Sequence, residues 1–423
     1  MTQLIDPMLL RGLNDMASPS STASDNLVAE LASLDRVNRA CKFFKTHGGE
    51  ITEEQIRICE IPAPPFGEAA RAAYFLNRYR EIGLTETTID AEGNCLGLRR
   101  GRSLTPLLVL SAHLDTVFPA ETDCSVRFSN GNLLAPGIAD DGCGLVALIA
   151  LARALDLGNI ETEGSILFVA TVGEEGEGDL RGVRYLFESG AWSDRINAFV
   201  SFDGPDVERI TNAAIGSRRY RATFRGSGGH SWGDFGVANP VNALGKVVSI
   251  LSRYPAPAKP RTTFNVGRIS GGTGTNVIPV EASMDVDLRS EAGDELQRLD
   301  AFFRRALRQV VDEENAQSRR PLGTLQLDLK MIGDRPLGIT ANATRIVKLA
   351  EQATRAVGVT PKLDRSSTDA NIPISLGIPA VTLGAGGKSG KTHTLDEWYD
   401  PKGRDLGLSR GLLLALAMVG VAG

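Results

Sequence analysis

Three short apolar stretches of the chain run directly into side chains that can bind metals or transfer protons. The stretches are typical of buried strands and cover residues 107–110, 165–172 and 198–202. The side chains that follow them are, in chain order, His113 and Asp115, Glu174 and Glu175, and Asp203. In open α/β sheets, ligands bind beyond the carboxyl ends of the strands. Three such endings therefore predict a crevice lined with hard ligands.

Two loops add further candidate ligands. The loop at 131–142 is rich in glycine, proline and aspartate, and it carries the adjacent carboxylates Asp140 and Asp141. It precedes an apolar helix predicted at 145–155, and a helix N-terminus favours negative charge. These aspartates could simply cap that helix, or they could bind metal. A glycine-rich loop near the C-terminus leads to His393.

The candidate ligands suit a pair of divalent metal ions. Two metals about 3.5–4 Å apart need a shared carboxylate and two flanking sets of ligands. Zinc accepts imidazole nitrogen and carboxylate oxygen, with an open position for water in catalytic sites. Asp140 could bridge the two metals. His113 and Glu175 could hold one metal, and Asp203 and His393 the other.

Glu174 and Asp115 are not assigned to a metal and could have other roles. Glu174 would lie beside the metal-bound water, where amide hydrolysis needs a general base. Asp115 could fix the tautomer of His113 through the second ring nitrogen. Alternatively, His113 caps a strand and Asp115 is a turn residue. The set contains no cysteine, which argues against a purely structural zinc site.

The remaining periodicity predicts an α/β catalytic domain in which helices flank a central mixed sheet. Further helices are predicted over 27–45, 53–61, 68–82, 343–357 and 406–421, and further strands over 87–90, 94–99 and 379–383. Residues 1–25 are predicted to form a loose or weakly helical lead-in.

Between residues 215 and 331 the pattern changes. Strands are predicted at 219–225, 262–269, 282–289 and 324–331, and helices at 240–252 and 294–314. The order β-α-β-β-α-β is that of a split βαβ unit. We therefore expect a discontinuous catalytic domain, 1–214 and 332–423, with an inserted ferredoxin-like α+β domain at 215–331.

The composition is that of an ordinary soluble globular protein. The 423 residues carry a net charge of -5, which argues against nucleic-acid and anionic-membrane partners. The five cysteines are scattered and form no CxxC, which predicts reduced thiols and a cytoplasmic setting. The sequence shows no apolar run long enough to span a bilayer, and its first residues do not resemble a signal peptide.

Eight motifs in this order resemble the M20 family of co-catalytic metallopeptidases, which includes glutamate carboxypeptidase, peptidase T and succinyl-diaminopimelate desuccinylase. They are SAHLDTV (111–117), GIADDG (137–142), GEEGEG (173–178), FDG (202–204), GGHS (228–231), GGTGTNVIP (271–279), DLR (287–289) and a segment from STDAN to HTLDE (367–397). Each motif is loose alone, but the ordered set is highly specific. The resemblance implies that Asp140 bridges the metals and is joined to Asp141 by a cis peptide bond. It also implies that Asp115 supports His113 and that Glu174 is the acid/base.

The resemblance further assigns roles within the inserted domain. It makes residues 215–330 a dimerisation lid, and hence the protein a homodimer, and it places a transition-state donor at His230. Edge-strand pairing across a two-fold axis would direct His230 to the metal cleft of the other subunit. Arg289 could clamp a substrate carboxylate or form a surface ion pair. Asn276 could donate to a substrate carbonyl or be a turn residue.

Two positions depart from the family pattern. Gly142 follows the paired aspartates where many members have lysine, and Asp203 stands where carboxypeptidases and deacylases often have glutamate. Aspartate there resembles the aminopeptidase and dipeptidase branch, as does the STDAN segment. We expect a hydrolase that uses two divalent metals, zinc first with cobalt or manganese as alternatives, to cleave small peptides. An N-acyl-amino-acid amidohydrolase of the same fold is the alternative, and a non-catalytic peptide-binding member is a remote one.

Overall fold

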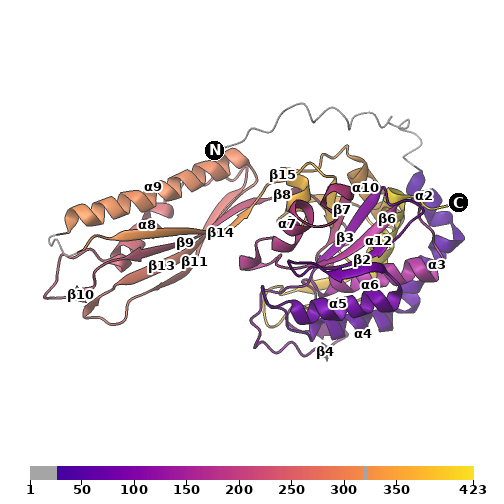
Figure 1. Cartoon of the computed structure of the whole chain (residues 1–423), viewed down its shortest axis with the longest axis horizontal. Helices are drawn as coiled ribbons and strands as arrows, with labels where there is room; N and C mark the ends of the chain where they lie inside the picture. The colour runs from indigo at the N-terminus through magenta and orange to yellow at the C-terminus, as the bar shows by residue number, and fades with distance from the viewer. Residues whose placement is uncertain (1–25, 319–322) are drawn as a thin grey trace.

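The computed structural model describes residues 26–318 and 323–423, which form two lobes (Figure 1). The lead-in predicted over 1–25 lies outside the described residues. The larger lobe is built on a nine-stranded mixed sheet with the order β1-β2-β6-β3-β7-β17-β8-β15, and β16 pairs with β8. Its strands are β1 (Thr85–Ile89), β2 (Cys95–Arg99), β3 (Leu107–His113), β6 (Ser165–Thr171), β7 (Ile196–Phe202), β8 (Arg209–Ala214), β15 (Gly338–Ile339), β16 (Lys362–Ser366) and β17 (Ala380–Leu383).

Helices cover both faces of this sheet. They are α2 (Leu27–Ser33), α3 (Asp35–Thr46), α4 (Gly48–Cys59), α5 (Ala69–Ile82), α6 (Gly142–Leu157), α7 (Arg181–Glu188), α10 (Arg345–Ala356), α11 (Asn371–Ser375) and α12 (Arg404–Val419). In β3, Leu108 and Leu110 pack into one hydrophobic cluster with α6 and α12, whereas Leu107 and Val109 pack into another with α7. Burial on both faces explains why the strand is continuously apolar rather than alternating.

Two local expectations differ from the structure. The helix expected over 27–45 is divided into α2 and α3, because Leu34 has extended backbone angles. The loop at 131–142 was expected to lack strands, but it contains β5 (Asn132–Leu134). This strand joins a small antiparallel sheet with β4 (Arg127–Ser129), β18 (Lys388–Gly390) and β19 (Trp398–Asp400). The small sheet brings the segments that carry Asp140 and His393 together. Three-residue strands are too short to give a periodic signal.

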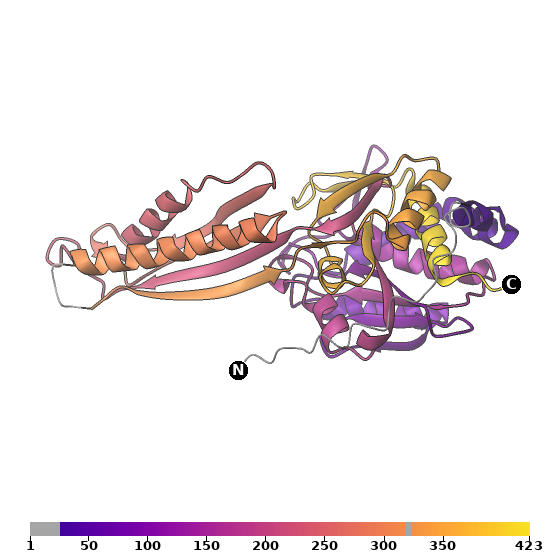
Figure 2. The ribbon, with the colours of Figure 1, turned by 90° about the horizontal axis from the view of Figure 1, so that it is seen from above.

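The smaller lobe, residues 216–335, is a four-stranded antiparallel sheet with two helices on one face. Its elements are β9 (Gly216–Arg225), α8 (Pro240–Leu251), β11 (Thr262–Gly271), β13 (Glu281–Ser290), α9 (Gly293–Gln317) and β14 (Gln326–Arg335), with the sheet order β11-β13-β9-β14. A two-stranded sheet of β10 (Gly229–His230) and β12 (Val277–Ile278) lies at the end of this lobe away from the large sheet (Figure 1). Figure 2 shows that long strands connect the lobes, and the strand expected over 324–331 continues to Arg335.

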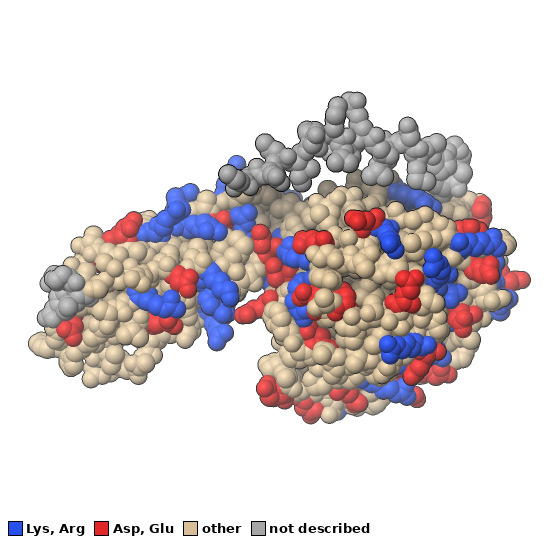
Figure 3. All heavy atoms as spheres, in the orientation of Figure 1, with Lys and Arg blue, Asp and Glu red and all other residues tan. Residues whose placement is uncertain are grey.

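Within the described part of the chain, no helix combines the length and apolar character needed to cross a bilayer. Acidic and basic side chains are interspersed over the face drawn in Figure 3, and both kinds gather where the lobes meet.

Candidate active site

Neighbouring parallel strands bring the predicted ligands to one edge of the large sheet. Strands β6, β3 and β7 lie side by side, and their carboxyl ends face the junction with the smaller lobe. His113, Asp140 and Glu175 offer ligand atoms that lie within 4.8 Å of one another. His113, Asp141 and Asp203 form a second group by the same measure.

Asp140 lies between two imidazole rings. Its Oδ1 is 3.1 Å from Nε2 of His113, and its Oδ2 is 3.0 Å from Nε2 of His393. Burial alone would raise the pKa of Asp140, but hydrogen bonds from both histidines lower it. Hydrogen bonds to Asp140 and Glu175 raise the pKa of His393 to about 10. Each imidazole thus shares a proton with carboxylates, and metal binding at such ligands displaces that proton. The donor set therefore fits divalent cations.

One hydrogen bond joins two side chains, Glu175 and His393, that we expected to hold different metals. The sequence suggested Glu175 with His113, and Asp203 with His393. In the structure, Oε1 of Glu175 is 2.9 Å from Nε2 of His393, and Glu175 and Asp203 each form a ligand group with His113. The loop that carries His393 takes this position because β19 pairs with β5.

The two adjacent aspartates have different surroundings. Asp141 is the N-cap of α6, because its Oδ1 accepts a hydrogen bond from the amide of Gly144 at 3.1 Å. Its Oδ2 accepts from the amide of His113 at 3.2 Å. The peptide bond between Asp140 and Asp141 is cis, as the resemblance implies. Helix capping, the alternative considered for both residues, describes Asp141 alone.

The carboxylate of Asp115 binds backbone amides rather than the imidazole of His113. The side chain is fully buried, and its two oxygens accept from the amides of Glu174 at 3.0 Å and Glu175 at 2.7 Å. The hydrogen bond expected at Nδ1 of His113 is made by the main-chain oxygen of Asp115 at 2.9 Å, whereas Oδ1 is 3.8 Å away. The carbonyl therefore orients the ring, and the carboxylate orients the backbone of the two glutamates.

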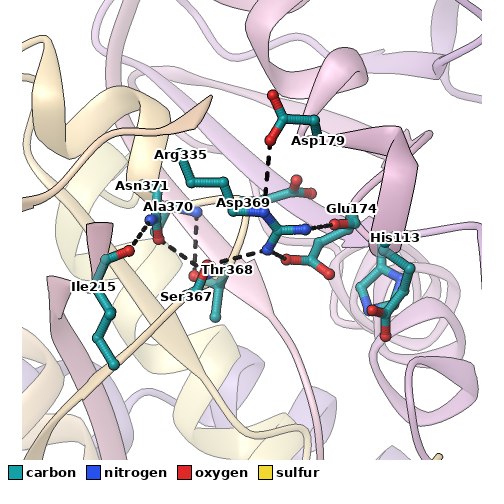
Figure 4. Close-up of polar contacts among 12 residues, drawn as sticks. His113, Glu174, Asp179, Ile215, Arg335, Ser367, Thr368, Asp369, Ala370 and Asn371 are labelled. Carbon is teal, nitrogen blue, oxygen red and sulfur yellow. Dashed lines mark hydrogen bonds and ion pairs between the residues drawn. The ribbon is translucent and has the colours of Figure 1, made fainter. Parts of the chain in front are cut away.

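Glu174 is buried next to the ligand group and is bound by an arginine. Nη1 of Arg335 donates to its Oε1 at 2.9 Å, and Nη2 donates to its main-chain oxygen. Burial raises the pKa of Glu174 well above its ordinary value, and Arg335 acts in the opposite direction. Figure 4 shows the carboxylate between Arg335 and His113.

A sequence profile of Peptidase family M20/M25/M40 matches residues 109–416. The chain belongs to this family. It is 26% identical over 363 residues to the uncharacterized protein YqjE of Bacillus subtilis, which covers 82% of the chain and 92% of that protein. It is 24% identical over 365 residues to a succinyl-diaminopimelate desuccinylase of Nitrosospira multiformis. This match also covers 82% of the chain and 92% of the desuccinylase. Aminopeptidase PepT from Bacillus cereus has a similar fold, with a TM-score of 0.65 and 22% identity over 87% of the chain and 97% of that structure. This M20 chain is a metal-dependent hydrolase of peptide or amide bonds.

Sequence reasoning missed three buried residues that support the M20 site. Glu397 accepts hydrogen bonds from the amides of Ala139 at 2.8 Å and Asp140 at 3.0 Å, and burial raises its pKa to about 7 against these bonds. Asp369 accepts from the hydroxyl of Thr171 at 2.5 Å, at the end of β6. Both carboxylates lie in motifs of the family resemblance, HTLDE and STDAN, which is the signal that could have found them. The third residue, Arg335, lies in none of the motifs.

Three predicted residues of the M20 chain do not join the ligand group. His230 lies in β10, at the far end of the smaller lobe, and Asn276 directly precedes β12, the partner strand of β10. Arg289 lies on β13, where its Nε donates to Asp287 at 2.6 Å. The structure thus brings His230 and Asn276 together, but away from the ligands of their own chain.

Proposed function

We propose that this chain is a zinc-dependent peptidase that acts on small peptides in the manner of an aminopeptidase or dipeptidase. The observation that carries the proposal is the position of Asp140, whose two oxygens face two different imidazoles. In this proposal Asp140 would be shared by two ions, His113 and Asp203 would hold one, and Glu175 and His393 would hold the other. When bound, the ions supply Lewis-acid polarisation of the scissile carbonyl and lower the pKa of the attacking water. Nitrogen and oxygen donors without thiolate suit zinc, and cobalt or manganese are alternatives.

Glu174 is the proposed general acid and base. Its carboxylate is buried among the ligands, and the burial that raises its pKa makes it a better proton acceptor. It takes a proton from the attacking water and delivers it to the nitrogen of the leaving amine as the amide bond breaks.

We propose that Asn276 and Arg289 bind the substrate, at a carbonyl and a terminal carboxylate respectively. The guanidinium of Arg289 is partly exposed and could bind a carboxylate bidentately. Asp203, in place of the glutamate of many deacylases, favours a peptidase. The second candidate is an N-acyl-amino-acid amidohydrolase, which the similarity to a desuccinylase over 92% of that protein favours. Screening the metal-loaded enzyme against di- and tripeptides beside N-acetyl and N-succinyl amino acids separates the two candidates.

His230 is the proposed donor to the oxyanion of the tetrahedral intermediate, acting in the site of a second copy of the chain. Nδ1 of its ring accepts from the amides of Trp232 and Gly233 at 3.2 Å each, so the ring proton is on Nε2, which is available to donate. His230 lies away from the ligands of its own chain, and the nearby Trp232 and Phe235 are 89% and 73% exposed. These features support a homodimer that forms through the smaller lobe, which would then be the dimerisation lid. We also propose a cytoplasmic setting, consistent with the five free cysteines.

The metal-loaded variant Glu174→Ala tests the proposed function. It should keep its metal content and lose activity by about 10²–10⁴-fold, the usual contribution of a general base. Near-native kcat would mean that another residue is the base. A structure grown with zinc tests the ligands, because ligand distances are near 2 Å and a metal more than about 5 Å from Asp140 or His393 would contradict the assignment.

Subunit exchange tests the action of His230 in the second copy. Mixing inactive His230→Ala with inactive Glu174→Ala should restore part of the activity, since each mixed dimer has one site with both groups intact. A single missing oxyanion donor typically lowers kcat about 10²–10³-fold. Proven heterodimers without recovered activity would contradict the proposal.

A further inference from the structure

The last strand of the smaller lobe ends with a buried arginine inside the catalytic lobe. Arg335 is the final residue of β14, and its side chain is only 4% exposed. Besides its two hydrogen bonds to Glu174, its Nη1 donates to the hydroxyl of Ser367 at 3.0 Å, and its Nε lies 3.9 Å from Oδ1 of Asp179. Figure 4 shows the guanidinium in contact with both the side chain and the main chain of Glu174.

We propose that Arg335 is a positioning residue for Glu174, through which the smaller lobe sets the orientation of the catalytic carboxylate. The proposal rests on the proposed role of Glu174 as the base. A planar guanidinium presents its donors in a fixed fork. Because this fork binds Oε1 and the main-chain oxygen of the same residue, it fixes the side chain of Glu174 relative to its own backbone. Oε2 is then the oxygen left to exchange a proton with water and the leaving amine.

The end of β14 is anchored to the catalytic lobe independently of Arg335. The amide of Asp334 donates to both carboxylate oxygens of Asp179, at 3.1 and 3.0 Å. Arg184, on α7, donates to the main-chain oxygen of Asp334. The backbone next to Arg335 is therefore fixed by other contacts. A residue that orients another side chain needs such a fixed backbone.

A neighbouring strand of the smaller lobe contacts the same catalytic segment. On β9, which pairs with β14, Arg219 donates to the main-chain oxygen of Gly176 at 2.5 Å, and Arg221 to Oε1 of Glu177 at 3.0 Å. Together with Arg335, these arginines link the smaller lobe to residues 174–177. A displacement of a catalytic group by about 1 Å can cost roughly 10²-fold in rate, so the position of the lobe matters for the base.

The test compares the activities of Arg335→Ala and Arg225→Ala. Arg225, the last residue of β9, is the control, since its Nε donates to Oε2 of Glu281 at 2.9 Å within the smaller lobe. For metal-loaded Arg335→Ala we expect unchanged metal content, kcat lower by about 10²-fold, and a KM that changes far less. Added guanidinium ion should partly restore kcat in this variant and not in the control. Arg335→Lys should recover little, because a point charge cannot bind both oxygens in the same geometry.

Hydrogen–deuterium exchange gives a readout that does not depend on activity. In metal-free and metal-loaded Arg335→Ala, the amides of residues 173–178 should exchange faster than in the native enzyme, whereas Arg225→Ala should leave them unchanged. If Arg335→Ala does not fold, Arg335→Gln and Arg335→Lys allow the same comparison.

The outcomes separate this proposal from the proposed function. Inactive Glu174→Ala together with native kcat and native exchange in Arg335→Ala would overturn the positioning role and leave the function intact. Near-native kcat in Glu174→Ala would overturn the function itself, and with it the role of Arg335 in catalysis. Loss of metal in Arg335→Ala in proportion to lost activity would also overturn positioning, because Arg335 would then support the ligands.

Discussion

Replacing Asp115 tests how the end of β3 organises the site. Its carboxylate is fully buried and accepts hydrogen bonds from two consecutive amides, those of the proposed base Glu174 and the proposed ligand Glu175, at 3.0 and 2.7 Å. Asp115→Ala leaves both amides without their acceptor. Asp115→Asn preserves the volume of the side chain but offers one acceptor, and its amino group faces the second amide.

The expected loss of stability follows from these two hydrogen bonds. A hydrogen bond to a charged group contributes about 1.5–3 kcal/mol, so Asp115→Ala should lower the free energy of unfolding by roughly 3–6 kcal/mol. For Asp115→Asn about half of that loss is expected, since one of the two bonds survives. Residues that orient metal ligands typically change metal affinity by about 10–100-fold when mutated, and we expect both variants to fall in that range.

Two measurements on purified protein check this prediction. Competition with a chelator gives metal affinity, and thermal unfolding of the metal-free protein gives stability, with about 2–4 °C expected per kcal/mol for a large domain. The matched control is Asp123→Asn, an exposed aspartate that accepts from the amide of Ser125 at 3.0 Å. Native metal affinity and an unchanged midpoint in Asp115→Asn would refute the idea that this carboxylate holds the segment in place.

Two further predictions concern the first turn of α6 and the pH dependence of the metal-free protein. A Cβ at Gly144 would collide with the carboxylate of Asp141, so Gly144→Ala should cost about 1–3 kcal/mol in unfolding free energy. Gly245→Ala in α8, where nothing lies within 4 Å of the new Cβ, should be neutral or stabilising in the same denaturant titration. Hydrogen bonds to carboxylates raise the pKa of His393 from 6.5 to about 10. His393 therefore contributes its full stabilisation below its ordinary pKa of 6.5. This stabilisation is lost as the pH rises through the raised pKa of about 10. Thermal midpoints of metal-free protein should fall more across this range in the native chain than in His393→Ala, and parallel profiles would contradict the prediction.

The ligands that follow strands could be predicted because they depend on one local rule. A buried apolar run that ends in His113 or Asp203 marks a strand end, and neighbouring parallel strands end at the same edge of a sheet. The pairing of Glu175 with His393 could not be predicted. It depends on β5 and β19, three-residue strands without periodicity that lie far apart in the chain. The hydrogen bonds of Asp115 to two backbone amides could not be predicted either. The residue type alone does not tell whether an aspartate binds an imidazole or a backbone amide.

The contact between Arg335 and Glu174 could not be predicted from the sequence, for one reason in the local strand pattern and one in the overall fold. Locally, the pairing of β14 with β9 is irregular between Met331 and Gly333, and such an irregularity breaks the alternation by which a strand is recognised. The sequence-based strand accordingly ends at Met331, before the arginine. In the overall fold, Arg335 reaches Glu174 because β14, the last strand of the smaller lobe, pairs with β9, the first strand of that lobe. The chain therefore re-enters the catalytic lobe next to the point where it leaves it. A sequence motif contains only the site residues that lie in one continuous segment. The residue that orients the base is supplied here by another part of the fold, so its role follows from the three-dimensional arrangement of the two lobes.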